Sequence, residues 1–225
     1  MNVSQWTLES ELNQLAGRDQ LVDSLRTLGL VEQNDGFASL ETISDWYRSG
    51  AETYGLHFAV TARSGRRYEY FMKACVAYAG GTPLKAIFAD WLSRRATVEG
   101  LGVGTPKLYA TGSVLLVEEY VPYTLTEALK YTHDRATLLR AVGVTVAHLV
   151  SAGFAPLSAH DWRSRRSDVI LVDFGQDLGP DNMAHSYESG LLSEVLDNLL
   201  QAGAQLSTSD LQLIGRAYEE IVQSG

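Results

Sequence analysis

The apolar residues change from a strand-like to a helical arrangement part-way along the chain, and no other feature constrains the fold as strongly. Between Phe37 and Pro122, apart from a helical segment that begins at Pro83, aromatic and β-branched residues are concentrated in short segments with turn-forming residues between them. After Pro122, apolar residues recur at helical spacing, most clearly over residues 135–152. The sequence therefore predicts an α+β protein whose first part is rich in strands and whose second part is mainly helical.

The order of the predicted elements follows from the same patterns and from the turn residues between them. Strands are predicted at residues 40–47, 54–62, 68–76, 107–111, 114–121 and 169–172. Helices are predicted over most of residues 1–30, from Pro83 to Val98, in a short segment capped by Thr124 or Thr126, and at 135–152, 186–201 and 207–222. A polar loop is predicted at residues 158–167.

Composition argues against several classes of protein. The 225 residues carry a formal net charge of -9, whereas a dedicated nucleic-acid-binding protein needs a surplus of Lys and Arg. Cys75 is the only cysteine, which excludes a disulfide framework and a Cys-rich zinc site. No segment approaches the ~20 apolar residues of a membrane helix, and the first residues lack the pattern of a secretory signal. We therefore expect a cytoplasmic protein that binds neither nucleic acid nor a membrane.

Several features that suggest chemistry follow one another along the chain. They are, in order, a turn of small residues at 48–53, Lys73 in the third strand, the acidic residues Asp90 and Glu99 in the predicted helix, the pair His160–Asp161, and Asp173-Phe174-Gly175 after an apolar strand. Lys73 lies between apolar neighbours and would be desolvated unless an anion met it. Taken singly, each feature also has a structural explanation, such as a hairpin turn at Asp173 or a solvent-facing Lys73. Only the order of these features along the chain favours a functional interpretation.

This order resembles the protein-kinase-like fold, and most closely its small-molecule branch of the aminoglycoside phosphotransferase and choline kinase type. The resemblance covers about residues 44–180. It implies a two-lobed protein with a β-rich nucleotide-binding N-lobe at 37–122 and a reduced helical C-lobe at 123–225, which carries the catalytic and metal-binding loops. Residues 1–36 would then be an N-terminal helical extension.

The resemblance also implies roles in catalysis and metal binding, with ATP and Mg²⁺ as cofactors. Asp161, beside His160, would accept or orient the substrate hydroxyl proton, and Asp173 would be the main Mg²⁺ ligand. The family has a metal-binding asparagine five residues after the catalytic aspartate. Arg166 occupies that position here and cannot bind a cation, so either Asp168 replaces the asparagine as second metal ligand or the second metal site is weakened.

Further residues would bind the nucleotide. Lys73 would contact the α- and β-phosphates and pair with a helix carboxylate, either Asp90 or Glu99. Ser49 and Gly50 would belong to the loop that covers the phosphates. The backbone of three hinge residues would contact adenine, and these residues are Glu119, Tyr120 and Val121.

The leading hypothesis is therefore an ATP- and magnesium-dependent phosphotransferase that moves the γ-phosphate to a hydroxyl of a small molecule or protein. The alternative is a kinase-like pseudoenzyme that acts as a nucleotide-binding or protein-interaction module. The arginine at position 166 and the modest glycine content of the 48–53 turn favour this alternative. A third interpretation is an unrelated α+β domain with chance motifs. The sequence does not indicate an oligomeric state.

Overall fold

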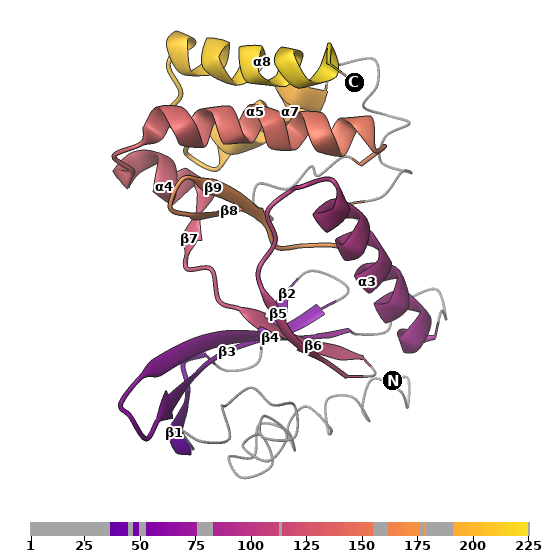
Figure 1. Cartoon of the computed structure of the whole chain (residues 1–225), viewed down its shortest axis with the longest axis vertical. Coiled ribbons are helices and arrows are strands. Elements are labelled where there is room, and N and C mark those ends of the chain that lie inside the picture. The colour runs from indigo at the N-terminus through magenta and orange to yellow at the C-terminus, as the bar shows by residue number, and fades with distance from the viewer. Residues whose placement is uncertain are drawn as a thin grey trace. The chain divides into compact units, whose positions relative to one another are not determined.

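The computed structural model describes residues 37–44, 47–49, 53–75, 83–112, 114–154, 162–175, 178 and 191–224. Within these residues the protein is α+β, as predicted, with nine strands and five helices (Figure 1). The strands are β1 (Phe37–Thr42), β2 (Tyr47–Ser49), β3 (Thr53–Ala62), β4 (Arg67–Cys75), β5 (Leu108–Thr111), β6 (Leu115–Glu119), β7 (Tyr123–Thr124), β8 (Trp162–Arg165) and β9 (Asp168–Leu171). The helices are α3 (Leu84–Gly100), α4 (Leu125–Tyr131), α5 (Arg135–Ser151), α7 (Leu191–Gln201) and α8 (Thr208–Val222).

The chain divides into two compact units. Unit 1 comprises Met1–Asp90 and Lys107–Tyr120, and unit 2 comprises Trp91–Pro106 and Val121–Gly225. The division after Tyr120 lies close to the expected lobe boundary at Pro122. The segment Trp91–Pro106, which was expected in the first lobe, belongs to unit 2. The predicted extension at residues 1–36 lies outside the described residues.

Unit 1 is built on an antiparallel sheet with the strand order β1-β3-β4-β6-β5, and β2 also pairs with β3. The single strand predicted at 40–47 is in fact two strands, because the chain bends at Ile43 and Ser44. The N–H groups of both residues donate to the His57 carbonyl, at 2.9 and 3.1 Å. A contact made far away in the sequence therefore interrupts the strand.

One face of this sheet forms an apolar core. Its fully buried members are Leu40, Leu56, Phe58, Val60, Tyr70, Met72 and Val117, with Tyr68, Tyr109 and Ala110 packed against them. Because successive strand residues point to opposite faces, the residues between these belong to the other face of the sheet. That second face carries Lys73.

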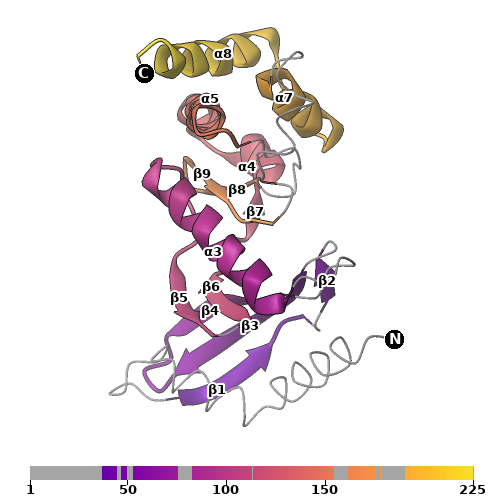
Figure 2. The same ribbon diagram turned by 90° about the vertical axis from the view of Figure 1, so that its right-hand side faces the viewer.

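Unit 2 combines helices with a small sheet. Helix α4 begins with a capping box in which Thr124 is the N-cap and Glu127 the reciprocal partner. Helices α5 and α8 lie side by side (Figures 1 and 2), and a Cβ added to Gly143 would lie 2.3 Å from the Ile214 carbonyl oxygen. A larger side chain there would force the two helices apart.

The small sheet has the order β7-β8-β9. The loop predicted at 158–167 is wrong over Trp162–Arg165, which form strand β8. Trp162 and Ser164 are buried there, and the arginine between them is partly exposed. This alternation is hidden in the sequence by three arginines. The predicted strand at 169–172 is confirmed as β9, shifted by one residue.

The helices predicted from Pro83 to Val98, at 135–152 and at 207–222 are confirmed as α3, α5 and α8, and their ends agree to within two residues. The helix predicted at 186–201 is confirmed over Leu191–Gln201, and its first residues lie outside the described part of the chain. None of the described helices has the length and apolar composition needed to cross a membrane.

Candidate functional site

Lys73 lies in β4 and forms an ion pair with Glu118 of the neighbouring strand β6. Lys73 Nζ and Glu118 Oε1 are 3.0 Å apart, and the side chains are 13% and 2% exposed. The register sets Phe71 opposite Glu118 and Lys73 opposite Leu116, so both charged residues lie on the face away from the apolar core. A carboxylate buried this deeply needs a cation beside it, and Lys73 supplies one.

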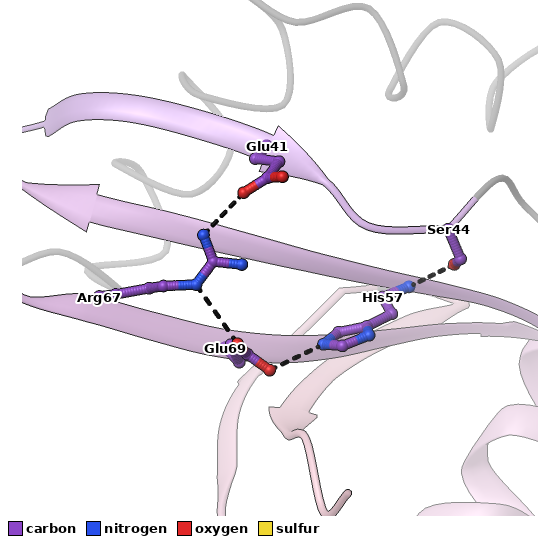
Figure 3. A network of polar contacts seen from close by, with 5 residues as sticks. All are labelled: Glu41, Ser44, His57, Arg67 and Glu69. Atoms are coloured by element: carbon purple, nitrogen blue, oxygen red, sulfur yellow. Dashed lines mark hydrogen bonds and ion pairs between the residues drawn. The ribbon is translucent and has the colours of Figure 1, made fainter.

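A network of polar side chains extends across the same face (Figure 3). Arg67 forms ion pairs with Glu41 of β1 at 2.6 Å and with Glu69 of β4 at 3.3 Å. Glu69 also contacts His57 Nε2 of β3 at 3.2 Å, and the His57 N–H donates to Ser44 Oγ at 3.0 Å. The hydrogen bonds from Arg67 to Glu41 and Glu69 raise the pKa of the guanidinium. Polar side-chain contacts therefore join three strands on the side of the sheet that lacks the apolar core.

Aromatic rings continue this network toward Lys73. The His57 and Tyr120 rings stack with centroids 3.5 Å apart and an interplanar angle of 17°. Phe71 lies 6.4 Å from the Tyr120 centroid, and Lys73 Nζ lies 5.8 Å from the Phe71 centroid. A flat ligand that approached this face would have to stack on these rings or displace them.

The three expected hinge positions differ in what their backbones already do. The Glu119 N–H donates to the Lys107 carbonyl at 2.8 Å, and its carboxylate accepts from the Lys107 N–H at 3.1 Å. The Tyr120 N–H donates to the Glu69 carbonyl at 3.5 Å. Val121 is buried and belongs to unit 2. The N–H groups of two of the three expected hinge residues, Glu119 and Tyr120, are thus bonded within unit 1.

In unit 2, Asp173 follows the buried strand β9 and begins a tight turn. Its Oδ1 accepts the Gly175 N–H at 3.0 Å, while Phe174 and Leu178 are buried. Strand β9 and the buried Phe174 side chain fix the backbone position of Asp173. Carboxylate oxygens suit hard cations such as Mg²⁺, so the chemistry of Asp173 fits the predicted metal.

Two consecutive arginines of α3 contact this turn. Arg94 Nη1 donates to the Gly175 carbonyl, and the Arg95 guanidinium lies 5.3 Å from the centroid of the Phe174 ring. Arg95 is 2% exposed and also pairs with Glu99. Neither arginine was predicted as a site residue, and an Arg-Arg pair on a helix gives no signal that distinguishes it from a solvated face.

The structure does not bring Asp168 and Asp173 together. Asp168 is the first residue of β9, opposite Arg165 at the hairpin turn, whereas Asp173 follows the other end of the strand. A strand advances ~3.3 Å per residue, so Asp168 and Leu171 are already about 10 Å apart. Two carboxylates that share one ion must both lie about 2 Å from it. This arrangement gives no support to Asp168 as a second ligand of the ion held by Asp173.

Arg166, at the position of the family's asparagine, lies in the turn of the same hairpin. Its φ is 58°, and it is the only non-glycine residue with positive φ among those that the structure describes. Ser164 Oγ donates to its carbonyl at 3.0 Å, which holds the turn. Arg166 is therefore at the opposite end of β9 from Asp173.

The expected helix partners of Lys73 are placed as follows. The Glu99 carboxylate accepts from Arg95 at 2.9 Å and from Thr105 Oγ1 at 2.8 Å, all within unit 2. Asp90 is exposed on α3. The carboxylate shown at Lys73 is Glu118, which the sequence analysis missed. A glutamate flanked by apolar residues in a predicted strand was the signal that could have identified it.

The remaining site residues lie outside the described part of the chain. These are His160, Asp161, Gly50 and the side chain of Ser49. Strand β8 begins at Trp162, the residue directly after Asp161, so no loop residues separate this aspartate from the strand.

No protein-family model matches the chain, and no curated protein matches it. Among the described residues, no three His, Cys, Asp or Glu side chains are grouped closely enough to hold a metal ion.

Proposed function

We propose that the protein is a two-lobed, kinase-like phosphotransferase that uses ATP and Mg²⁺ to phosphorylate a hydroxyl group of a small molecule or a protein. The observation that carries this proposal is the Lys73–Glu118 ion pair on the polar face of the unit 1 sheet. A carboxylate at 3.0 Å orients the lysine while leaving ammonium protons for other acceptors. In the resembling family a strand lysine held by a carboxylate binds the α- and β-phosphates.

Asp173 supports the proposal from unit 2. A carboxylate after a buried strand, with a glycine two residues on, matches the family's metal-binding motif. Bound Mg²⁺ would neutralise the charge on the phosphates during transfer. Asp161 would orient the acceptor hydroxyl and take its proton. The rate enhancement would then come mainly from positioning and from electrostatic stabilisation.

The proposal is tested by thermal unfolding and ATP turnover, each with and without Mg²⁺. Wild type is compared with Asp173→Asn and with Asp168→Asn, a matched control at the other end of β9. We expect ATP with Mg²⁺ to raise the melting temperature of wild type and of Asp168→Asn, and to support turnover in both. Asp173→Asn should lose the shift and the turnover. A wild-type protein with neither response would refute the proposal.

A second candidate is a kinase-like pseudoenzyme that acts as a binding or regulatory module. Specific observations favour it: Asp168 is separated from Asp173, and the N–H groups of Glu119 and Tyr120 are bonded within the sheet. The His57–Tyr120 stack also lies on the polar face. The same experiment separates the two candidates, because a thermal shift that persists without turnover across hydroxyl-bearing acceptors identifies the pseudoenzyme.

A further inference from the structure

Both backbone polar groups of Gly175 are hydrogen-bonded to side chains. The Gly175 N–H donates to Asp173 Oδ1 at 3.0 Å, and the Gly175 carbonyl accepts from Arg94 of α3. The orientation of the Asp173 carboxylate is therefore tied to that of Gly175, and Gly175 is tied to the helix. All of these residues belong to unit 2.

Arg95 holds the middle of the turn. Its guanidinium lies 5.3 Å from the centroid of the Phe174 ring, within the range of a cation–π contact. The same guanidinium pairs with Glu99 at 2.9 Å and donates to the Pro106 carbonyl. A charge that is 98% removed from water is tolerated only with such partners, so the arrangement around Arg95 is specific.

The loop after α3 also packs directly on β9. The Leu171 N–H donates to the Gly104 carbonyl at 2.9 Å, and Gly104 forms a parallel bridge with Ile170. A Cβ added to Gly104 would lie 2.4 Å from the Val169 carbonyl oxygen. The second half of α3, its following loop and the end of β9 are therefore held together by backbone and side-chain contacts.

We propose that Arg94 and Arg95 are positioning residues that orient the Asp173 carboxylate through their contacts with Gly175 and Phe174. The role assigned to the carboxylate rests on the proposed function, whereas the coupling rests on the contacts alone. Loss of either arginine would loosen this turn and, with it, the carboxylate that is hydrogen-bonded to Gly175. Partners that orient a metal ligand typically contribute 10–100-fold to affinity.

The first measurement is amide hydrogen exchange at Gly175 in the full-length protein. Arg94→Met removes the donor to the Gly175 carbonyl, and the double variant Arg95→Met with Glu99→Gln removes the buried charge and its counterion together. Removing both members of the pair leaves no unpaired charge behind. We expect exchange at Gly175 to accelerate by about tenfold or more in both, because local opening becomes easier. The amide of Val146, which lies within helix α5, is the internal control and should not change.

Two further variants sharpen the measurement. Arg94→Lys keeps a single cationic donor and should restore slow exchange at Gly175. Arg140→Met removes an exposed arginine of α5, whose pair with Glu220 is 3.2 Å long, and should leave Gly175 unaffected. The second measurement is the Mg²⁺ concentration that gives half of the thermal shift with ATP, which should rise about tenfold in Arg94→Met.

Each result has a defined meaning. Unchanged exchange at Gly175 in Arg94→Met and in the double variant overturns the inference. Equal acceleration at Val146 and Gly175 also overturns it, because the arginines would then stabilise the whole unit. If wild type shows no shift with ATP and Mg²⁺, the proposed function fails, while selective acceleration at Gly175 still supports the coupling.

Discussion

The two units hold their internal cations in different ways. In unit 1, Lys73 pairs with Glu118 inside a sheet, and the carboxylate is 2% exposed. In unit 2, the Arg95 side chain is only 3% exposed, but that of Glu99 is 45% exposed, and the guanidinium also contacts a carbonyl and an aromatic ring. In unit 1, both charged groups of the Lys73–Glu118 pair are therefore removed from most of the water around them. In unit 2, the Glu99 carboxylate stays partly hydrated, and Arg95 has two further contacts besides the ion pair. We expect single substitutions to destabilise unit 1 more than unit 2.

The largest effect is expected for Glu118→Leu. This change leaves Lys73 without the carboxylate at 3.0 Å, and breaking a buried pair from one side destabilises by about 3–5 kcal/mol. The double variant Lys73→Met with Glu118→Leu should recover most of that loss, because no charge then remains to be desolvated. Urea unfolding of the three proteins measures the difference. Equal stabilities for the single variant and wild type would remove the basis of the comparison.

A buried phenol in the same unit gives the next effect, at alkaline pH. Burial raises the pKa of Tyr70 to about 12, and its ring packs on Phe58 and Tyr109. Tyrosine titrates near pH 10 in the unfolded chain, so the contribution is complete below pH 10 and is lost as pH rises toward 12. We expect a loss of about 2 kcal/mol by pH 12 in wild type and a smaller loss in Tyr70→Phe.

The control for this prediction is Tyr131→Phe, which changes a tyrosine of unit 2 that is 78% exposed. Its dependence of unfolding free energy on pH should match that of wild type. If Tyr70→Phe and wild type lose stability in parallel between pH 10 and 12, the phenol of Tyr70 is not the group responsible.

A smaller effect is expected for Arg95→Met in unit 2. The Glu99 carboxylate left behind is half exposed and can be hydrated, and the methionine keeps an apolar contact with Phe174. We expect a loss of about 1.5–2 kcal/mol, near the lower end of the range for hydrogen bonds that involve a charged group. Urea unfolding alongside Glu118→Leu makes the comparison direct. A loss as large as that of Glu118→Leu would show that shared contacts do not lessen the penalty.

Features of the fold that are decided locally could be predicted from the sequence. Helices α5 and α8 were found because their apolar residues repeat at helical spacing, and Thr124 was one of two predicted caps. Strand β8 was missed because its buried Trp162 and Ser164 alternate with arginines in a segment that reads as polar. The break between β1 and β2 was missed because the His57 carbonyl, far along the chain, causes it.

The candidate site divides in the same way. Lys73 lies within a strand and Asp173 follows one, as their apolar neighbours indicate. Glu118 could not be predicted as a partner of Lys73, because the register between β4 and β6 brings these two side chains together. The separation of Asp168 from Asp173 follows from the extended strand β9, which begins at Asp168. In the turn before this strand, Arg166 occupies a backbone conformation that favours glycine.

The smallest effect is expected for an ion pair of unit 2 that is only partly shielded from water. Asp210 accepts from Arg135 at 2.9 Å and completes the capping box of α8 with Ser207. The hydrogen bond from Arg135, followed by those from Ser207, lowers the pKa of the Asp210 carboxyl. Its contribution is therefore present at pH values above the unfolded pKa near 4 and is lost as pH falls through the folded value.

Asp210→Asn should thus lower stability at pH 7 by about 1 kcal/mol or less, and high salt should reduce the difference because such pairs are screened. The difference from wild type should shrink as pH falls below 4. Glu220→Gln is the matched control, since its pair with Arg140 joins side chains that are 52% and 62% exposed, and it should change nothing measurable. An Asp210→Asn effect that keeps its size in acid would have to come from the hydrogen bonds of the cap. In that case the charge of Asp210 would contribute nothing to stability. The difference between the buried Lys73–Glu118 pair of unit 1 and the partly exposed ion pairs of unit 2 would then be larger than expected.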